Sequence, residues 1–243
     1  MDCDVEEPNS HIFLKPRIDH IKSANVLMPE VNHDLCDYCG KCASACEYNA
    51  IVVLPTQVMV FPELCHGCGL CSMVCPRDAI SEEPRKIGVI KKGRSDDSIE
   101  LIYGLLNIGE IMAAPLIDQV KEEINPKRTV IVDVPSGTAC PVIASLTGVD
   151  IALVVTEPTM SGLHDLERIL DVTRHFGIAS VVCINKYDIN EANSRRITEF
   201  CHERGVKIAK NIPYDPVVTE AMVAAMPVVE FSDCAVSDAI REI

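Results

Sequence analysis

Tryptophan is missing from the 243 residues, and the aromatic content is only 4%. Apolar residues nevertheless make up 48% of the chain, so it can bury a sizeable core. With so few aromatic rings available, that core must be mainly aliphatic. A chain of this length can form one large domain with an insert, or two small domains.

Positive charge is also scarce, because 22 Lys and Arg stand against 36 Asp and Glu and leave a net charge of −14. Surfaces that bind nucleic acids or anionic membranes are basic, so we expect neither kind of partner. No stretch approaches the roughly 18–20 uncharged apolar residues of a transmembrane helix. The acidic, polar start, residues 1–10, does not resemble a signal peptide. We therefore expect a cytoplasmic location.

Cysteine, in contrast, is abundant, with 13 in the chain. In the cytoplasm cysteines stay reduced, so they are expected to be metal ligands or buried thiols, not a disulfide scaffold. Eight of them form two runs with the same spacing. These are Cys36-x2-Cys39-x2-Cys42-x3-Cys46 and Cys65-x2-Cys68-x2-Cys71-x3-Cys75. The others are scattered, and most of them are expected to be small buried hydrophobes: Cys3, Cys140, Cys183, Cys201 and Cys234.

The two cysteine runs belong to a longer internal repeat. Each residue of the second copy stands 29 positions after its counterpart, as Cys65 does after Cys36. Asn49-Ala50-Ile51 ends the first copy and Asp78-Ala79-Ile80 ends the second. A repeat of this length indicates two copies of one supersecondary unit. The copies differ after the fourth cysteine, where the first has Glu47, a negative charge near a cluster, and the second has Pro76.

The cysteine spacing is that of the bacterial two-cluster ferredoxins, in which the fourth cysteine of each run ligates the other cluster. Three cysteines two residues apart can wrap a loop round one corner of a cube, while the fourth points away. The expected metal ligands are therefore Cys36, Cys39, Cys42 and Cys75 for one [4Fe–4S] cluster, and Cys65, Cys68, Cys71 and Cys46 for the other. Gly40, Gly67 and Gly69 are expected in tight turns with positive φ.

A pair of zinc sites is the alternative reading of the cysteines. Zinc sites usually take two CxxC pairs separated by a longer gap. A dense triple of cysteines that occurs twice favours iron–sulfur clusters. Two such clusters close together suit one-electron transfer.

The rest of the chain alternates apolar runs with helical patterns. Strands are expected near Val26 and over residues 129–133, 150–155 and 180–184, and helices over 161–176 and 191–203, the latter ended by Gly205. Strands that alternate with helices predict a parallel sheet covered on both faces.

Several segments together resemble the MinD/ParA/Mrp superfamily of P-loop ATPases, and more narrowly its members with an inserted ferredoxin domain. In chain order they are Asp2–Asn9, the two cysteine runs, Asp133–Pro141, Asn185–Asp188 and Ile212–Pro216. The resemblance covers nearly the whole chain. It implies an α/β fold with the parallel sheet of the deviant-Walker ATPases, incomplete at the N-terminus, with an inserted α+β ferredoxin-like domain. The ATPase-like domain would comprise residues 1–32 and 86–243, and the insert residues 33–85.

The resemblance also implies roles in a nucleotide site. Asp4 matches the aspartate that orients the attacking water, and Asp133 matches the one that holds Mg²⁺ through water. Asn185 matches the base-contacting asparagine, with Pro213 and Asp215 near the base. Each has a simpler explanation: Asp4 as a solvated acid, Asp133 as the cap of a turn, and Asn185 as a turn residue after a strand. Residues 185–188 also fit the NKxD pattern of GTPases, so ATP and GTP both stay open.

The family's glycine-rich lysine loop, KGGxGKT, is missing from this sequence. That loop cradles the nucleotide phosphates, and no glycine here is followed by Lys and then Ser or Thr. The expectation is an N-terminally truncated chain that does not hydrolyse ATP alone. An intact form would bind ATP and Mg²⁺, and family members dimerise across the nucleotide.

Three functions stay open. The first is an iron–sulfur protein that links nucleotide binding to delivery of an electron or cluster to an unidentified redox or iron–sulfur partner. The second is a ferredoxin-type carrier on a degenerate, non-hydrolysing scaffold. The third is a non-functional fragment.

Overall fold

The computed structural model describes residues 1–96 and 98–243. The chain divides into two compact units. Unit 1 comprises Met1–Pro8 and Arg17–Ile131, and unit 2 comprises Asn9–Pro16 and Val132–Ile243. In the part of the chain that the structure describes, no helix is long and apolar enough to cross a membrane.

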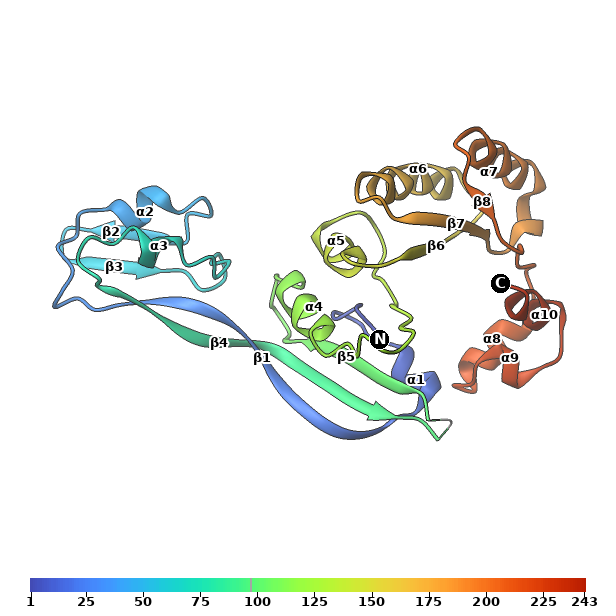
Figure 1. The fold of residues 1–243 in the computed structure, drawn as a ribbon, viewed down its shortest axis with the longest axis horizontal. Coiled ribbons are helices and arrows are strands. Elements are labelled where there is room, and N and C mark those ends of the chain that lie inside the picture. The colour runs from blue at the N-terminus through green and yellow to red at the C-terminus, as the bar shows by residue number, and fades with distance from the viewer. Residues whose placement is uncertain (97) are drawn as a thin grey trace. The chain divides into compact units, whose positions relative to one another are not determined.

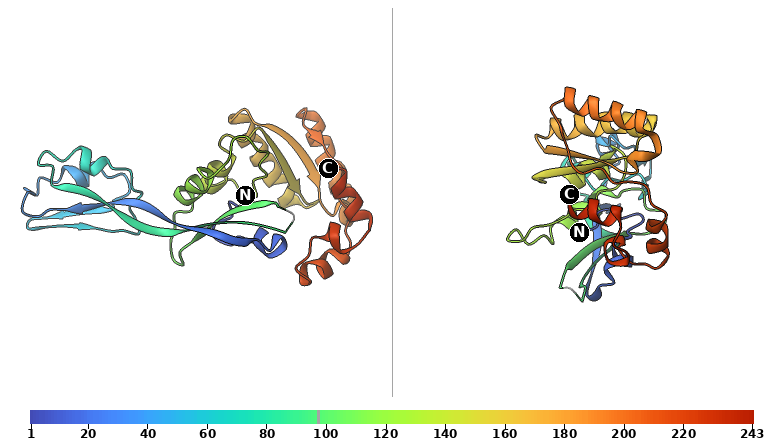
Figure 2. Two further views of the ribbon diagram at one scale, coloured as in Figure 1. Left: turned by 60° about the horizontal axis from the view of Figure 1, so that its bottom comes forward. Right: turned by 90° about the vertical axis from the view of Figure 1, so that its right-hand side faces the viewer.

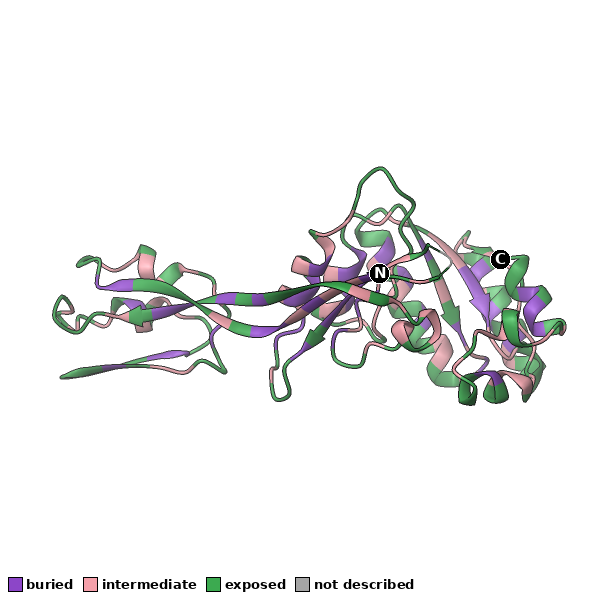
Figure 3. Cartoon of the chain, turned by 90° about the horizontal axis from the view of Figure 1, so that it is seen from below, coloured by how far each residue is buried: buried purple, intermediate pink, exposed green. Residues whose placement is uncertain are grey.

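Unit 1 is organised by a long antiparallel ribbon of two strands, β1 (Arg17–Val31) and β4 (Ile80–Arg94) (Figure 1 and Figure 2). The pairing starts at Val31 opposite Ile80 and ends at Arg17 opposite Arg94. From Ser23 to Met28 the side chains of β1 alternate, so that Ala24, Val26 and Met28 are buried and the residues between them are exposed (Figure 3). This two-residue period is the one that a strand with a single buried face requires. The expected strand near Val26 is confirmed.

One end of the ribbon packs into a core. There β4 also pairs with β5 (Glu100–Leu106), and α4 (Ala114–Lys121) packs against these strands. Leu116, Ile117 and Val120 of α4 are fully buried, as the apolar stripe of an amphipathic helix requires. Gly104 permits the close packing, because a Cβ there would lie 2.6 Å from Val5 and 3.0 Å from Val120.

The other end of the ribbon carries the two cysteine runs (Figure 1). Each run contains one short helix, α2 (Lys41–Ala45) or α3 (Leu70–Met73), and the hairpin of β2 (Ile51–Leu54) and β3 (Gln57–Val60) joins the two copies. The N–H of Asn32 bonds to Ala79 O, and the N–H of Phe61 bonds to Ala50 O. The copies of the repeat therefore follow matching backbone paths.

Unit 2 is built on a parallel sheet with strand order β6-β7-β8, formed by β6 (Ile151–Thr156), β7 (Ala179–Ile184) and β8 (Lys207–Ile208). The long helices are α6 (Met160–His175) and α7 (Glu191–Glu203), and their apolar faces meet the sheet in a core of Leu166, Leu170, Val182, Ile184, Ile197 and Cys201. The shorter elements are α1 (Ser10–Leu14), α5 (Cys140–Leu146), a 3₁₀ helix (Tyr187–Asn190), α8 (Val217–Val223), α9 (Val228–Phe231) and α10 (Ala235–Arg241).

Local signals set the ends of the two long helices. Thr159 Oγ1 accepts the Gly162 N–H at the start of α6, and Asn190 Oδ1 accepts the Asn193 N–H at the start of α7. Gly177 and Gly205 follow these helices with positive φ, as left-handed helix ends require. The strands predicted over residues 150–155 and 180–184 and both predicted helices are confirmed.

Two expectations about the sheet are wrong. Residues 129–133 form no continuous strand: Ile131 O accepts a hydrogen bond from the Met1 ammonium at 2.8 Å and Asp133 lies in an isolated bridge, but no ladder of bonds extends over the run, and Val130 and Ile131 are exposed. The sheet is also not covered on both faces at β6. Ala152 packs against Val142 and Leu146 of α5, but Ile151, Leu153 and Val155 on the opposite face of β6 are exposed, with Ile151 at 59%.

Candidate iron–sulfur centre

The first three cysteines of the first run line a cavity together with the last cysteine of the second run. The cavity wall contains Cys36, Cys39, Cys42 and Cys75, and Cys46 is not part of it. Apolar side chains close its inner side: Val31, Val53, Val58 and Ile80. Cys42 is buried and Cys39 exposed, so the site reaches from the interior of this end of the ribbon to its surface.

The second run also exposes its second cysteine, but the burial of the first and third cysteines is reversed relative to the first run. Cys65 is buried, Cys68 is exposed and Cys71 is half-buried. Gly67 and Gly69 both have positive φ, as does Gly40 in the first run, so the expectation for these three glycines is confirmed. At Gly67 a side chain is also excluded by packing, because a Cβ there would lie 2.8 Å from Leu27 O.

Contacts between side chains link the start of each run to the end of the other. Asp37, which follows Cys36, pairs with Arg77, which stands two positions after Cys75, with 3.3 Å between Oδ2 and Nε. His66 follows Cys65 and stacks on Tyr48, two positions after Cys46, with ring centroids 3.6 Å apart and planes 10° apart. The residue types differ, but each contact joins the residue after the first cysteine of one run to the residue two positions after the fourth cysteine of the other.

Backbone N–H groups point at four of the cysteine sulfurs. Tyr38 N and Gly67 N each lie 3.4 Å from the sulfur of the first cysteine of their run, Cys36 and Cys65. Ala50 N and Ala79 N each lie 3.3 Å from the sulfur of the fourth cysteine, Cys46 and Cys75. Donors in these positions stabilise negative charge on sulfur, which is the form of the ligand that binds metal.

The electrostatics show that the cysteines of each run act on one another. Burial raises the pKa of the Cys42 thiol, and Cys36 and Cys39 add to the rise. Burial likewise raises the pKa of Cys71, to which Cys65 and Cys68 contribute. A thiolate is costly in these positions unless a positive centre compensates it, and bound iron supplies that charge.

The four cysteines around one cavity fit the ligand set of an iron–sulfur cube. In residues 1–96 and 98–243, no three His, Cys, Asp or Glu side chains converge closely enough to hold one metal ion. A cube does not need such convergence, since each thiolate binds a different iron atom at a different corner. The donor set is all cysteine, as [4Fe–4S] clusters require.

The side-chain pairs that flank the cysteines were not predicted from the sequence. The Asp37–Arg77 pair and the Tyr48–His66 stack both lie at the positions one after the first cysteine and two after the fourth. The 29-residue repeat could have revealed this, since both pairs occupy matching positions. Tyr38 has φ of 57°, in the position where the second run has glycine, a strain that its sequence does not indicate.

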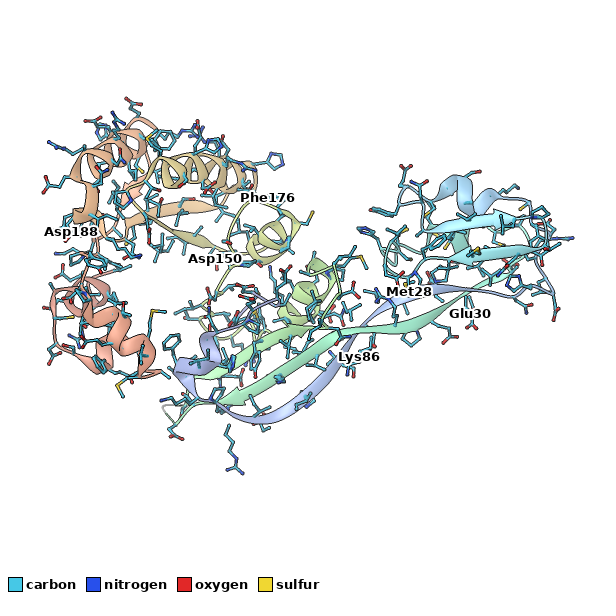
Figure 4. All side chains as sticks on the ribbon, turned by 180° about the vertical axis from the view of Figure 1, so that it is seen from behind. Met28, Glu30, Lys86, Asp150, Phe176 and Asp188 are labelled. Carbon is cyan, nitrogen blue, oxygen red and sulfur yellow. The ribbon has the colours of Figure 1, made fainter. Side chains whose placement is uncertain are left out.

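The residues expected at a nucleotide site are only partly brought together. Asn185 follows β7 and pairs with Ile212 in an isolated parallel bridge, so it lies beside the segment that holds Pro213 and Asp215. Asp188, labelled in Figure 4, strengthens this junction by accepting the Tyr214 N–H at 2.7 Å. This is the edge at which the parallel strands end, where α/β folds bind ligands.

The two other aspartates expected at this site belong to different units. Asp133 lies in unit 2 and accepts a hydrogen bond from Ser10 Oγ at 3.1 Å. Asp4 lies in unit 1, and its N–H bonds to the side chain of Asp2. Asp215 caps the start of α8 through the Val217 N–H at 3.0 Å.

Comparison with known proteins supports both parts of this description. Residues 29–81 match the family model of the 4Fe-4S dicluster domain. The septum site-determining protein MinD of Pyrococcus horikoshii, solved with Mg-ADP, matches 99% of this chain and 79% of its own, with a TM-score of 0.55 and 16% identity. The fold and the site thus define an iron–sulfur protein that combines a 4Fe–4S dicluster domain with a MinD-like α/β fold.

Two proteins of Methanocaldococcus jannaschii are similar to this chain in sequence. The uncharacterized protein MJ0578 of Methanocaldococcus jannaschii is 32% identical over 247 residues, which span all of this chain and 83% of that protein. The chain belongs to the family of this protein. The uncharacterized protein MJ0579 of the same organism is 30% identical over 158 residues, which span 61% of this chain and 51% of that protein.

Proposed function

We propose that this chain binds two [4Fe–4S] clusters and passes electrons, one at a time, to a partner protein. One cluster is held by Cys36, Cys39, Cys42 and Cys75, and the other by Cys65, Cys68, Cys71 and Cys46. The observation that carries this proposal is the cavity whose wall takes three cysteines from one run and the last cysteine from the other.

The residues around each site have distinct tasks. The clusters, when bound, supply the one-electron redox chemistry. The thiolates bind iron, and the four backbone N–H groups near sulfur offset part of their negative charge. Apolar side chains such as Ile51, Val58 and Ile80 keep water from the inner side. The exposed Cys39 and Cys68 bring each site to the surface, where a redox partner can approach.

Metal and sulfide analysis tests this proposal. Protein prepared without oxygen should contain about eight iron and eight acid-labile sulfide per chain, since each cluster has four of both. It should bleach when dithionite reduces it and recover on reoxidation. Zinc without sulfide would overturn the proposal, and about four iron would leave only one cluster.

A second function is supported by the fold. We propose that unit 2 binds a nucleotide base at Asn185, Pro213 and Asp215, and that nucleotide binding is linked to electron or cluster delivery. Support comes from the bridge between Asn185 and Ile212 at the carboxyl edge of the sheet. Asp4 and Asp133 would orient water and hold Mg²⁺ only where a glycine-rich lysine loop is supplied. These 243 residues contain no such loop, so we expect no ATP hydrolysis by them alone.

The alternative is an electron carrier on a scaffold that no longer binds nucleotide. Calorimetric titration with MgATP and MgGTP separates the two. Binding at low micromolar concentration that weakens in Asn185→Ala would exclude the pure carrier. The absence of binding at millimolar nucleotide would favour it.

The cellular setting follows from the same chemistry. None of the 13 cysteines forms a disulfide in the structure, which favours a reducing compartment such as the cytoplasm. A homodimer across the nucleotide is a further expectation, which sedimentation with and without MgATP would test.

A further inference from the structure

The two proposed cluster sites have nearly the same backbone environment. Gly40 and Gly69 hold matching positions, and both have positive φ and precede the helix of their run. Each site would also receive two backbone N–H groups near sulfur, one at a first cysteine and one at a fourth. Neither backbone path nor hydrogen bonding therefore distinguishes the sites.

Charge does distinguish them. Glu82 of β4 reaches the loop of the second run, where its Oε1 lies 2.9 Å from the point that a Cβ on Gly69 would occupy. Gly69 stands directly after Cys68. In the first copy of the repeat the position of Glu82 is taken by Val53, and nothing lies within 4 Å of a Cβ built on Gly40.

The fourth cysteines add to the difference. Glu47 follows Cys46, which would ligate the second cluster, whereas Pro76 follows Cys75 at the first. Glu82 therefore lies against the loop of the second site, and Glu47 directly follows one of its expected ligands in the sequence.

The first site has the opposite balance. Its cavity is lined by Asp37, Lys41 and Arg77. Asp37 and Arg77 pair with each other, so Lys41 is left as the net positive charge. In the second copy the position of Lys41 is taken by Leu70.

From this asymmetry we propose that Glu82, assisted by Glu47, lowers the reduction potential of the cluster held by Cys65, Cys68, Cys71 and Cys46, so that the other cluster is reduced first. The proposal rests on the function proposed above. Reduction adds one electron to a cluster and forms or breaks no bond. A nearby carboxylate opposes the added negative charge, and a nearby ammonium favours it. An electron received by the second cluster would therefore move on to the first.

Glu82→Gln tests this, because it removes the charge and keeps the shape of an exposed side chain. Glu83→Gln is the matched control, since Glu83 is the next residue on β4 and points to the opposite face of the ribbon. The reconstituted proteins are titrated with dithionite, and the electron paramagnetic resonance signal is followed against potential. Iron and sulfide are counted in each sample first.

The wild-type protein should show two potentials. Glu82→Gln should raise the lower potential. The shift should increase the ratio of reduced to oxidised cluster at a given applied potential by about two- to tenfold, where tenfold corresponds to 59 mV for one electron. The higher potential and the Glu83→Gln control should stay within error. Adding Glu47→Gln should raise the lower potential further. All shifts should shrink from about 0.01 M to about 1 M salt, because exposed charges are screened.

Three results would overturn the proposal: no shift in Glu82→Gln, a shift of the higher potential instead, or an equal shift in Glu83→Gln. A sample without sulfide would instead refute the proposed function itself. The iron and sulfide counts thus separate the two failures.

Discussion

The assignment of the fourth cysteine to the opposite run gives the sharpest prediction. Cys36→Ala together with Cys39→Ala removes two ligands of the first site, and alanine offers no ligand atom in their place. This background should hold one cluster, so about four iron and four sulfide per chain remain. Because Cys75 lines the same cavity as Cys36 and Cys39, it has no remaining role in that background.

A third substitution in this background then shows which fourth cysteine ligates the remaining cluster. Cys75→Ala should leave the four iron unchanged, whereas Cys46→Ala should remove at least the iron that it holds and, with three thiolates left, most of the cluster. The assay is iron and sulfide content with the visible spectrum, in anaerobic protein. Cys140→Ala is the control, since Cys140 is exposed and lies outside both runs. If Cys75→Ala empties the protein and Cys46→Ala does not, each run ligates its own cluster and the assignment is wrong.

Further predictions concern packing, the buried ion pair and the nucleotide. Gly67→Ala should destabilise the second site more than Gly40→Ala destabilises the first, because both glycines have positive φ but only Gly67 faces a backbone oxygen, that of Leu27. Thermal unfolding and iron content would measure the two effects. Equal effects would contradict the packing argument. Glu110→Gln should lower stability by about 1–3 kcal/mol, because it leaves the largely buried Arg85 without its charged partner. Burial alone would raise the pKa of Glu110, but the hydrogen bond and charge of Arg85, together with the N–H groups of Met112 and Ile111, outweigh burial and the pKa is lowered. This stabilisation is therefore present above the pKa of an unfolded glutamate and is lost as pH falls through the lower folded value, so urea unfolding of wild type and Glu110→Gln should converge in acid. A phosphate-release assay on the 243 residues should stay at background with MgATP, and turnover would show that another lysine supplies the missing loop.

Elements dictated by local patterns could be predicted from the sequence. The cysteine spacing, the three glycines with positive φ and the helices of unit 2 all depend on residues a few positions apart, and the structure agrees with each. Gly205 ends α7 because its backbone has the positive φ of a left-handed helix end.

Features that depend on distant partners could not be predicted. Thr129 to Asp133 is β-branched and apolar, but a strand also needs a neighbour, and propensity does not report one. Likewise β4 continues past the predicted end of the insert at residue 85, because Gly88 to Arg94 find their partners in β5. The placement of Glu82 beside Gly69 depends on how the ribbon passes the second run, which no spacing in the sequence encodes.

The length of the β1–β4 ribbon has a consequence for how unit 1 can transmit information. From Val31 to Asn25, where Gln119 of α4 bonds to the strand, β1 advances roughly 20 Å at about 3.3 Å per residue. Charge in salt solution is screened within about 8 Å, so the packed end of the ribbon at α4 and β5 lies beyond the reach of a change in cluster charge. Any signal of the oxidation state that arrives there must travel as mechanical strain, through the twist and register of the paired backbones.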